Sequence, residues 1–99
     1  YGVSIDFNDS IVYITDVQHL DDILINKDGS LFNYAYYSLQ LKTYLEGTLG
    51  EMNQTCAVIY SDKKKKLESR YLKTCKKYQS DKAASVRMIG TDSFMFHKE

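Results

Sequence analysis

The chain has 99 residues, of which 43% are hydrophobic and 26% are charged, and its formal net charge is zero. This length and composition predict one globular domain with a modest core, and they exclude an intrinsically disordered chain. The apolar runs fall short of the roughly 20 residues of a membrane-spanning helix, and zero net charge argues against a dedicated nucleic-acid-binding protein.

The charge is unevenly distributed along the sequence. Residues 1–60 contain two basic and eight acidic side chains, whereas residues 61–99 contain eleven basic and five acidic ones, so the two parts carry −6 and +6. This asymmetry is compatible with a local anion site, an acidic partner or head-to-tail self-association.

The first fifteen residues predict two strands. Apolar residues alternate with small or polar ones over Tyr1–Phe7, which is typical of a strand with one solvent-exposed face and therefore of an edge strand. Residues 11–15 form a nearly continuous β-branched apolar run, which is typical of an interior strand covered on both faces. The turn residues at 8–10 favour an antiparallel hairpin between these strands.

A polar, acidic segment follows at residues 16–22. Residues 23–25 and 31–32 are apolar and flank the turn sequence of residues 26–29, which predicts either a small hairpin or a packed loop. Asn33 is then a plausible N-cap for a helix that ends between Gly47 and Gly50.

The second half predicts a central strand, a helix and a final strand. Residues 56–60 are a continuous apolar run, and Ser61 or Asp62 is placed to cap a helix that ends between residues 79 and 84. The apolar residues within 86–89 are expected to pack where the chain returns after the second helix. Ser93–His97 is predicted to form the last strand.

The element order β-β-α-β-α-β predicts a single α/β domain over residues 1–99, with a small mixed sheet of about four strands and two helices. We expect three parallel strands and an antiparallel edge strand, and the pattern leaves open whether the helices cover one face or both. The alternative is a ferredoxin-like α+β sandwich, which would require the hairpin at residues 23–32 to join the sheet.

Four consecutive lysines at the predicted start of the second helix are the strongest local anomaly. Cations at a helix N-terminus oppose the helix dipole, whereas free N–H groups at that end favour an anion. The candidate anion site comprises Ser61, Lys63, Lys64, Lys65, Lys66 and Arg70. No glycine-rich phosphate loop accompanies these residues, so a solvated basic turn is the competing interpretation.

The basic residues continue along the same helix. Arg70, Lys73 and Lys77 have the spacing of one helical face, which suits the backbone of a nucleic acid. No nucleic-acid-binding motif accompanies them, so we do not expect a nucleic-acid partner.

The sequence does not indicate an enzyme, a metal site or a cofactor. The acidic segment with Asp16, His19, Asp21 and Asp22 matches no calcium-binding loop and is expected to be solvated. Neither His19 nor His97 has a neighbouring nucleophile in sequence. Cys56 and Cys75 form no motif, and whether they are free or bridged is left open.

Tyrosines offer the other candidate site. The sequence contains nine, and Tyr36 and Tyr37 in the first helix are candidate interaction residues because tyrosine contributes large contact area at little entropic cost. Their competing role is at the boundary of the core.

Three stretches, Val12–Asp16, Tyr34–Leu45 and Val58–Ser61, resemble small secreted or lipoprotein-type domains of gut Bacteroides-like bacteria. The resemblance implies a periplasmic, cell-envelope or secreted location, no known activity and no functional residues, and a cytoplasmic location is left open. Because the sequence begins with Tyr1 rather than Met, we expect a processed or trimmed form.

Together these observations predict a non-enzymatic interaction domain that binds a protein or surface partner through tyrosines and opposed charge patches. The alternative is an anion- or nucleic-acid-binding module that uses the basic second helix. Formation of a homo-oligomer is left open.

Overall fold

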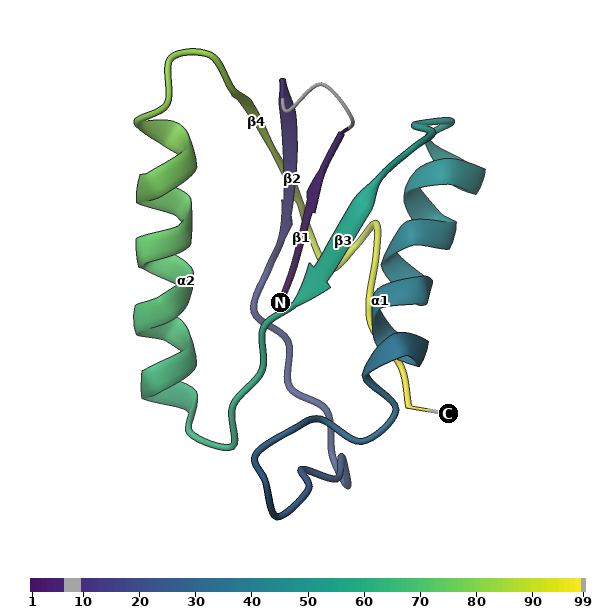
Figure 1. The fold of residues 1–99 in the computed structure, drawn as a ribbon, viewed down its shortest axis with the longest axis vertical. Helices are drawn as coiled ribbons and strands as arrows, with labels where there is room; N and C mark the ends of the chain where they lie inside the picture. The colour runs from purple at the N-terminus through teal and green to yellow at the C-terminus, as the bar shows by residue number, and fades with distance from the viewer. Residues whose placement is uncertain (7–9, 99) are drawn as a thin grey trace.

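The structure is a computed structural model that describes residues 1–6 and 10–98. It contains four strands and two main helices, and the first helix continues into a single turn of π-helix, η1 (Figure 1). In chain order the elements are β1 (Gly2–Ile5), β2 (Ile11–Thr15), α1 (Tyr34–Thr43), η1 (Tyr44–Thr48), β3 (Thr55–Val58), α2 (Lys64–Gln79) and β4 (Ser85–Ile89).

The four strands form one mixed sheet in the order β3-β1-β2-β4, which confirms the predicted small α/β fold. Strand β1 pairs antiparallel with both β2 and β3, and β2 pairs parallel with β4. Three strands therefore run in one direction, as expected. Strand β1, which runs in the opposite direction, lies inside the sheet rather than at its edge. Strand β3 is an edge strand rather than a central one.

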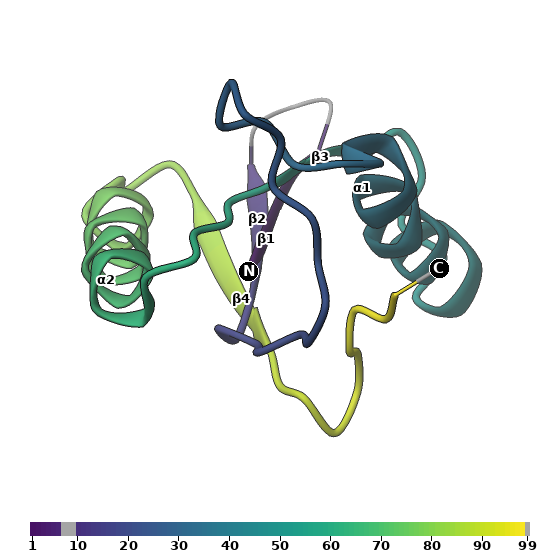
Figure 2. The ribbon, with the colours of Figure 1, turned by 90° about the horizontal axis from the view of Figure 1, so that it is seen from below.

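The helices lie on opposite faces of the sheet (Figure 2). The chain passes from β2 to β3 through α1, and it passes back from β3 to β4 through α2. Crossovers of the same hand that run in opposite directions place their helices on opposite faces. One core cluster accordingly lies under α1, around Leu41 and Leu45, and the other lies under α2, around Ile14 and Leu67.

The predicted exposed face of β1 is in fact covered. Gly2 and Ser4 point toward α1 and are buried, because small residues at these positions let the helix approach the sheet. The Ser4 hydroxyl donates to Gln54 Oε1 at 2.7 Å, which satisfies it inside the protein. The prediction of an edge strand was wrong because small side chains can mark close packing as well as exposure to water.

The last strand is also placed differently. β4 is Ser85–Ile89, whereas the predicted strand at Ser93–His97 has no regular secondary structure. Phe94 and Phe96 of this C-terminal segment nevertheless pack into the α1-side core. The apolar run at residues 94–96 is buried at both of its phenylalanines, but the backbone of this segment bonds to glutamine side chains instead of a strand.

The segment between β2 and α1 forms a small hairpin outside the sheet. Ile25 pairs with Leu31 in an isolated antiparallel bridge, and the Phe32 N–H donates to the Leu24 carbonyl at 2.9 Å. Since this hairpin does not join the sheet and the helices cover both faces, the ferredoxin-like alternative was wrong. The tip of the predicted β1–β2 turn, residues 8 and 9, lies outside the described residues.

Candidate functional site

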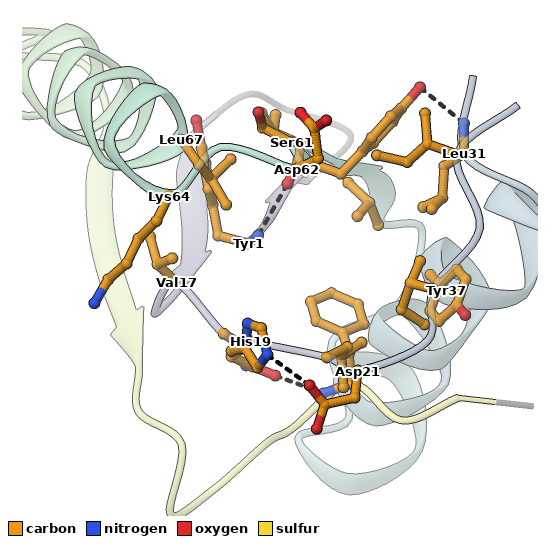
Figure 3. A pocket seen from close by; sticks show the side chains of 18 of the residues that line it. Tyr1, Val17, His19, Asp21, Leu31, Tyr37, Ser61, Asp62, Lys64 and Leu67 are labelled. Atoms are coloured by element: carbon orange, nitrogen blue, oxygen red, sulfur yellow. Dashed lines mark hydrogen bonds and ion pairs between the residues drawn. The ribbon is translucent and has the colours of Figure 1, made fainter. Parts of the chain in front are cut away.

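A cavity of about 850 Å³ opens where β2 and β3 end (Figure 3). Its volume falls within the roughly 300–1,000 Å³ typical of ligand pockets. Its walls come from the segment after β2, the hairpin, the end of β3, the start of α2 and the C-terminal segment. The lining residues are Tyr1, Val17, Gln18, His19, Leu20, Asp21, Asp22, Ile23, Ile25, Leu31, Tyr37, Val58, Ile59, Tyr60, Ser61, Asp62, Lys64, Leu67, Glu68 and Phe96.

The strand order explains why the cavity lies at this end of the sheet. Strands β2 and β3 run in the same direction, and their chains then diverge toward opposite faces, which leaves a crevice beyond their carboxyl ends. Tyr1, at the start of the opposed strand β1, lies between them. Its backbone and that of Ile59 exchange hydrogen bonds of 3.0 and 2.9 Å, which fix the base of the crevice.

The interior of the cavity is apolar. Leu31, Tyr37, Leu67 and Phe96 are all buried and belong to the two cores, so the cavity walls are rigidly packed. The Tyr60 hydroxyl lies at one side, where it accepts from the Leu31 N–H at 3.0 Å and donates to the Gly29 carbonyl at 3.1 Å. These two bonds tie the hairpin to the end of β3.

The hairpin carries apolar side chains on both of its faces. Ile25 and Leu31 line the cavity, whereas their neighbours Leu24 and Phe32 do not. Leu24 is 63% exposed and Phe32 is 51% exposed. Leu24 and Phe32 therefore add exposed apolar surface on the hairpin, outside the lining of the cavity.

Charged side chains lie at the rim, whereas the Tyr1 amino group lies at the base beside the Ile59 carbonyl, where burial lowers its pKa to about 6. His19 Nε2 lies 2.8 Å from Asp21 Oδ1, and both side chains are 86% exposed. Lys64 and Glu68 form a weak i,i+4 pair at 3.9 Å. Within residues 1–6 and 10–98, the carboxylates of Asp22 and Asp62 have no ion-pair partner.

The predicted anion site is only partly assembled. Ser61 and Lys64 reach the cavity, but Lys63, Lys65, Lys66 and Arg70 are exposed side chains outside its lining. The N-cap of α2 is Lys63 and not Ser61 or Asp62, and it makes no side-chain cap bond. Ser61 Oγ instead accepts from the Lys63 N–H at 3.0 Å. The capping prediction was wrong because helical geometry begins one residue later than the capping residues suggest.

The two candidate interaction tyrosines have different surroundings. Tyr37 is only 5% exposed and contributes its ring to the core and to the cavity wall, so it offers almost no outer surface. Tyr36 is half-buried, with its ring edge-on to Tyr37 and to His97 at centroid distances of 5.5 and 6.2 Å. Tyr37 is therefore a structural residue of the core, and the interaction role of Tyr36 stays a prediction.

The acidic segment is divided by the fold. His19, Asp21 and Asp22 line the cavity, whereas Asp16 does not. The Asp16 N–H continues the sheet by donating to the Ile89 carbonyl at 3.2 Å. Over the described parts of the chain, no group of three or more His, Cys, Asp or Glu side chains is arranged to hold a metal ion.

The two cysteines are free and lie on opposite sides of the sheet. Cys56 borders a smaller cavity of about 440 Å³ between α1 and β3, and its thiol donates to Ser4 Oγ at 3.3 Å. Burial raises the pKa of the Cys56 thiol above its ordinary value, which disfavours the nucleophilic thiolate.

Sequence reasoning missed the apolar part of the site. Ile25 and Leu31 lie in the hairpin, Ile59 follows β3 and Phe96 lies in the C-terminal segment, so no local motif joins these residues. The sequence does contain one relevant signal, namely the two apolar runs that flank the turn at residues 26–29. Their pattern predicts a small hairpin or a packed loop, and it does not indicate that this segment lines a cavity.

No protein-family model matches the chain, and comparisons with curated proteins and with solved structures gave no match.

Proposed function

We propose that this chain is a non-enzymatic binding domain whose site is the cavity at the carboxyl ends of β2 and β3. The observation that carries the proposal is a cavity of about 850 Å³ with buried apolar side chains in its wall and charged side chains at its rim. Such a site offers shape and contact area. The rim groups His19 and Ser61 already bond to Asp21 and to the backbone, so the site lacks a nucleophile paired with a base.

A protein partner fits this surface better than a small molecule does. Leu24 and Phe32 stand exposed on the hairpin outside the lining of the cavity, and a small ligand inside the cavity would leave both uncovered. A protein that inserts one segment into the cavity would cover them at the same time.

Chemical-shift mapping tests this proposal directly. We expect a neutral probe peptide, acetyl-Gly-Leu-Phe-Leu-Gly-amide, to shift the backbone amide signals of Ile23, Leu31 and Ile59 in ¹⁵N-labelled protein. The substitution Ile25→Asp, which places a charge in the cavity wall, is expected to weaken binding at least about tenfold, because a charge is costly to bury in an apolar contact.

The matched control is Leu72→Asp on α2. Leu72 is 64% exposed and lies outside the cavity, so this variant adds the same charge and is expected to bind like the original chain. Equal weakening by both variants, or shifts confined to other surfaces, would refute the proposed site.

A second candidate function rests on the exposed basic side of α2. Eight basic side chains of this region are exposed, and Glu68 pairs weakly with Lys64 alone among them. This arrangement supports anion or nucleic-acid binding through charge density, without a shaped site. The eight are Lys63, Lys64, Lys65, Lys66, Arg70, Lys73, Lys76 and Lys77.

The envelope or secreted location stays a prediction from the resemblance. Over the described residues, neither α1 nor α2 has the length and apolar character needed to cross a membrane. Fractionation of cells that express the full gene would test the location.

A further inference from the structure

We propose that the cavity receives a basic peptide segment of a partner protein, in which a large apolar side chain is flanked by Lys or Arg. This inference rests on the proposed function and names the chemistry of the partner. The apolar interior would take the apolar side chain, and carboxylates at the rim would take the flanking cations.

The carboxylates stand on opposite sides of the cavity mouth. Figure 3 shows Asp21 beside His19 on one side and Asp62 beside Ser61 on the other. Asp22 follows Asp21 on the same loop and also lines the cavity. A peptide that crosses the mouth would therefore meet a carboxylate on each side of its inserted side chain.

Two of these carboxylates are available to a ligand. Asp22 and Asp62 form no ion pair within the described parts of the chain. An unpaired carboxylate beside an apolar surface attracts a docking cation more strongly than a fully hydrated carboxylate does. The attraction is stronger because docking displaces part of the water around the two charges. Exposed pairs of this kind contribute modestly to affinity and more to the choice of partner.

The nearby lysines do not reverse this preference inside the cavity. The side chain of Lys64 points away from the cavity in Figure 3, and it pairs with Glu68. Lys63, Lys65 and Lys66 do not line the cavity and are exposed. Because these three side chains are exposed, solvent and salt screen their charge.

The experiment compares three peptides by NMR titration of the ¹⁵N-labelled chain at low and at physiological ionic strength. The neutral probe is acetyl-Gly-Leu-Phe-Leu-Gly-amide, and the charged probes replace both Gly residues with Lys or with Glu. We expect the Lys peptide to bind about fivefold to twentyfold more tightly than the Glu peptide at low salt, and the difference to shrink as salt rises.

Substitution of the rim carboxylates identifies the source of this preference. Asp22→Asn and Asp62→Asn are each expected to weaken the Lys peptide about two- to fivefold while leaving the neutral peptide unchanged. The control is Asp81→Asn, which removes one negative charge after the far end of α2. Its amide oxygen can still accept the 2.9 Å bond from the Ala83 N–H.

The outcomes separate the two proposals. If no peptide shifts the cavity amides, the proposed function fails. If all three peptides shift them with equal affinity, the binding site stands and the preference for a basic partner is refuted. Tighter binding of the Glu peptide, or equal effects of Asp81→Asn and Asp62→Asn, would also overturn the preference.

Discussion

At the scale of single residues, Gly2 decides how closely α1 approaches the sheet. A Cβ atom added at Gly2 would lie 2.6 Å from Leu41 Cδ2 and 3.0 Å from Phe96 Cζ. Leu41 is fully buried and Phe96 is nearly so, which leaves neither side chain room to move. The Gly2 N–H is also held by Thr15 Oγ1 at 2.8 Å, so β1 cannot easily shift away.

The substitution Gly2→Ala is therefore expected to lower the free energy of unfolding by about 1–3 kcal/mol, as overpacked cores do. Chemical denaturation monitored by circular dichroism measures this change. Gly47→Ala is the control, because nothing lies within 4 Å of the added methyl group and alanine favours helix, so no loss is expected. A Gly2→Ala variant as stable as the original chain would show that the core is looser than described.

At the scale of elements, two glutamine side chains replace a strand in holding the C-terminal segment. Gln18 donates to the Phe94 carbonyl at 3.2 Å and accepts from the Phe96 N–H at 2.7 Å. Gln40 makes the same pair of bonds with the backbone of His97, at 2.7 and 2.9 Å. A side-chain amide has an NH₂ group that donates and a carbonyl oxygen that accepts, so it can satisfy a backbone N–H and carbonyl as a neighbouring strand would.

Gln18→Leu is expected to cost about 2 kcal/mol of stability, because it leaves a partly buried backbone N–H and carbonyl without partners. Gln40→Leu is expected to cost less than about 1 kcal/mol, since its bonds are exposed and water can replace them. Urea denaturation of both variants provides the comparison. Equal losses would mean that burial does not set the strength of these bonds.

Gln18 also lines the cavity, which links this element to the proposed site. By fixing Phe96, it holds one apolar wall in place. A Gln18→Leu variant that stays folded tests whether the wall must be fixed for the neutral peptide to bind.

At the scale of the whole molecule, the opposite charges of the two sequence halves are not neutralised by long-range pairs that the structure describes. Its described ion pairs join residues two or four positions apart, namely His19–Asp21, Lys42–Glu46 and Lys64–Glu68. Of the eight exposed basic side chains of residues 63–77, Lys64 lines the cavity together with the acidic residues of its rim, and the other seven are separated from its lining.

This separation gives a test of the second candidate function. If α2 binds phosphate polymers, a fluorescent single-stranded oligonucleotide will bind in a salt-dependent way, and changing all of Lys63–Lys66 to Gln will abolish most of the binding. For each phosphate group that a lysine no longer neutralises, the slope of log affinity against log salt should fall by about 0.7.

The matched control carries the same reduction of charge on other exposed lysines, namely Lys27, Lys42, Lys82 and Lys98. Equal weakening by the control would assign the binding to total charge alone. Binding that does not change with salt would exclude this function.

The sequence predicted most elements because their signals are local. The β-branched run of β2, the helical spacing of α1 and α2, and the alternation in β1 each depend on neighbours in the chain. Where the apolar run at residues 94–96 suggested a strand, Phe94 and Phe96 are buried without strand pairing and Met95 is exposed. Periodicity records which side of a segment is buried and does not identify the partner of its backbone.

By itself, the sequence determined the α/β class, the shared direction of β2 and β3, and the exposed lysines at the start of α2, because each follows from local pattern and chain connectivity. Only the tertiary structure decided that β1 lies inside the sheet, that the helices cover both faces, and that the hairpin closes a cavity beside β3. Those features depend on the packing of Gly2 against Leu41 and on the hydrogen bond between Tyr60 and Leu31. Each joins residues far apart in sequence, and no local pattern encodes it.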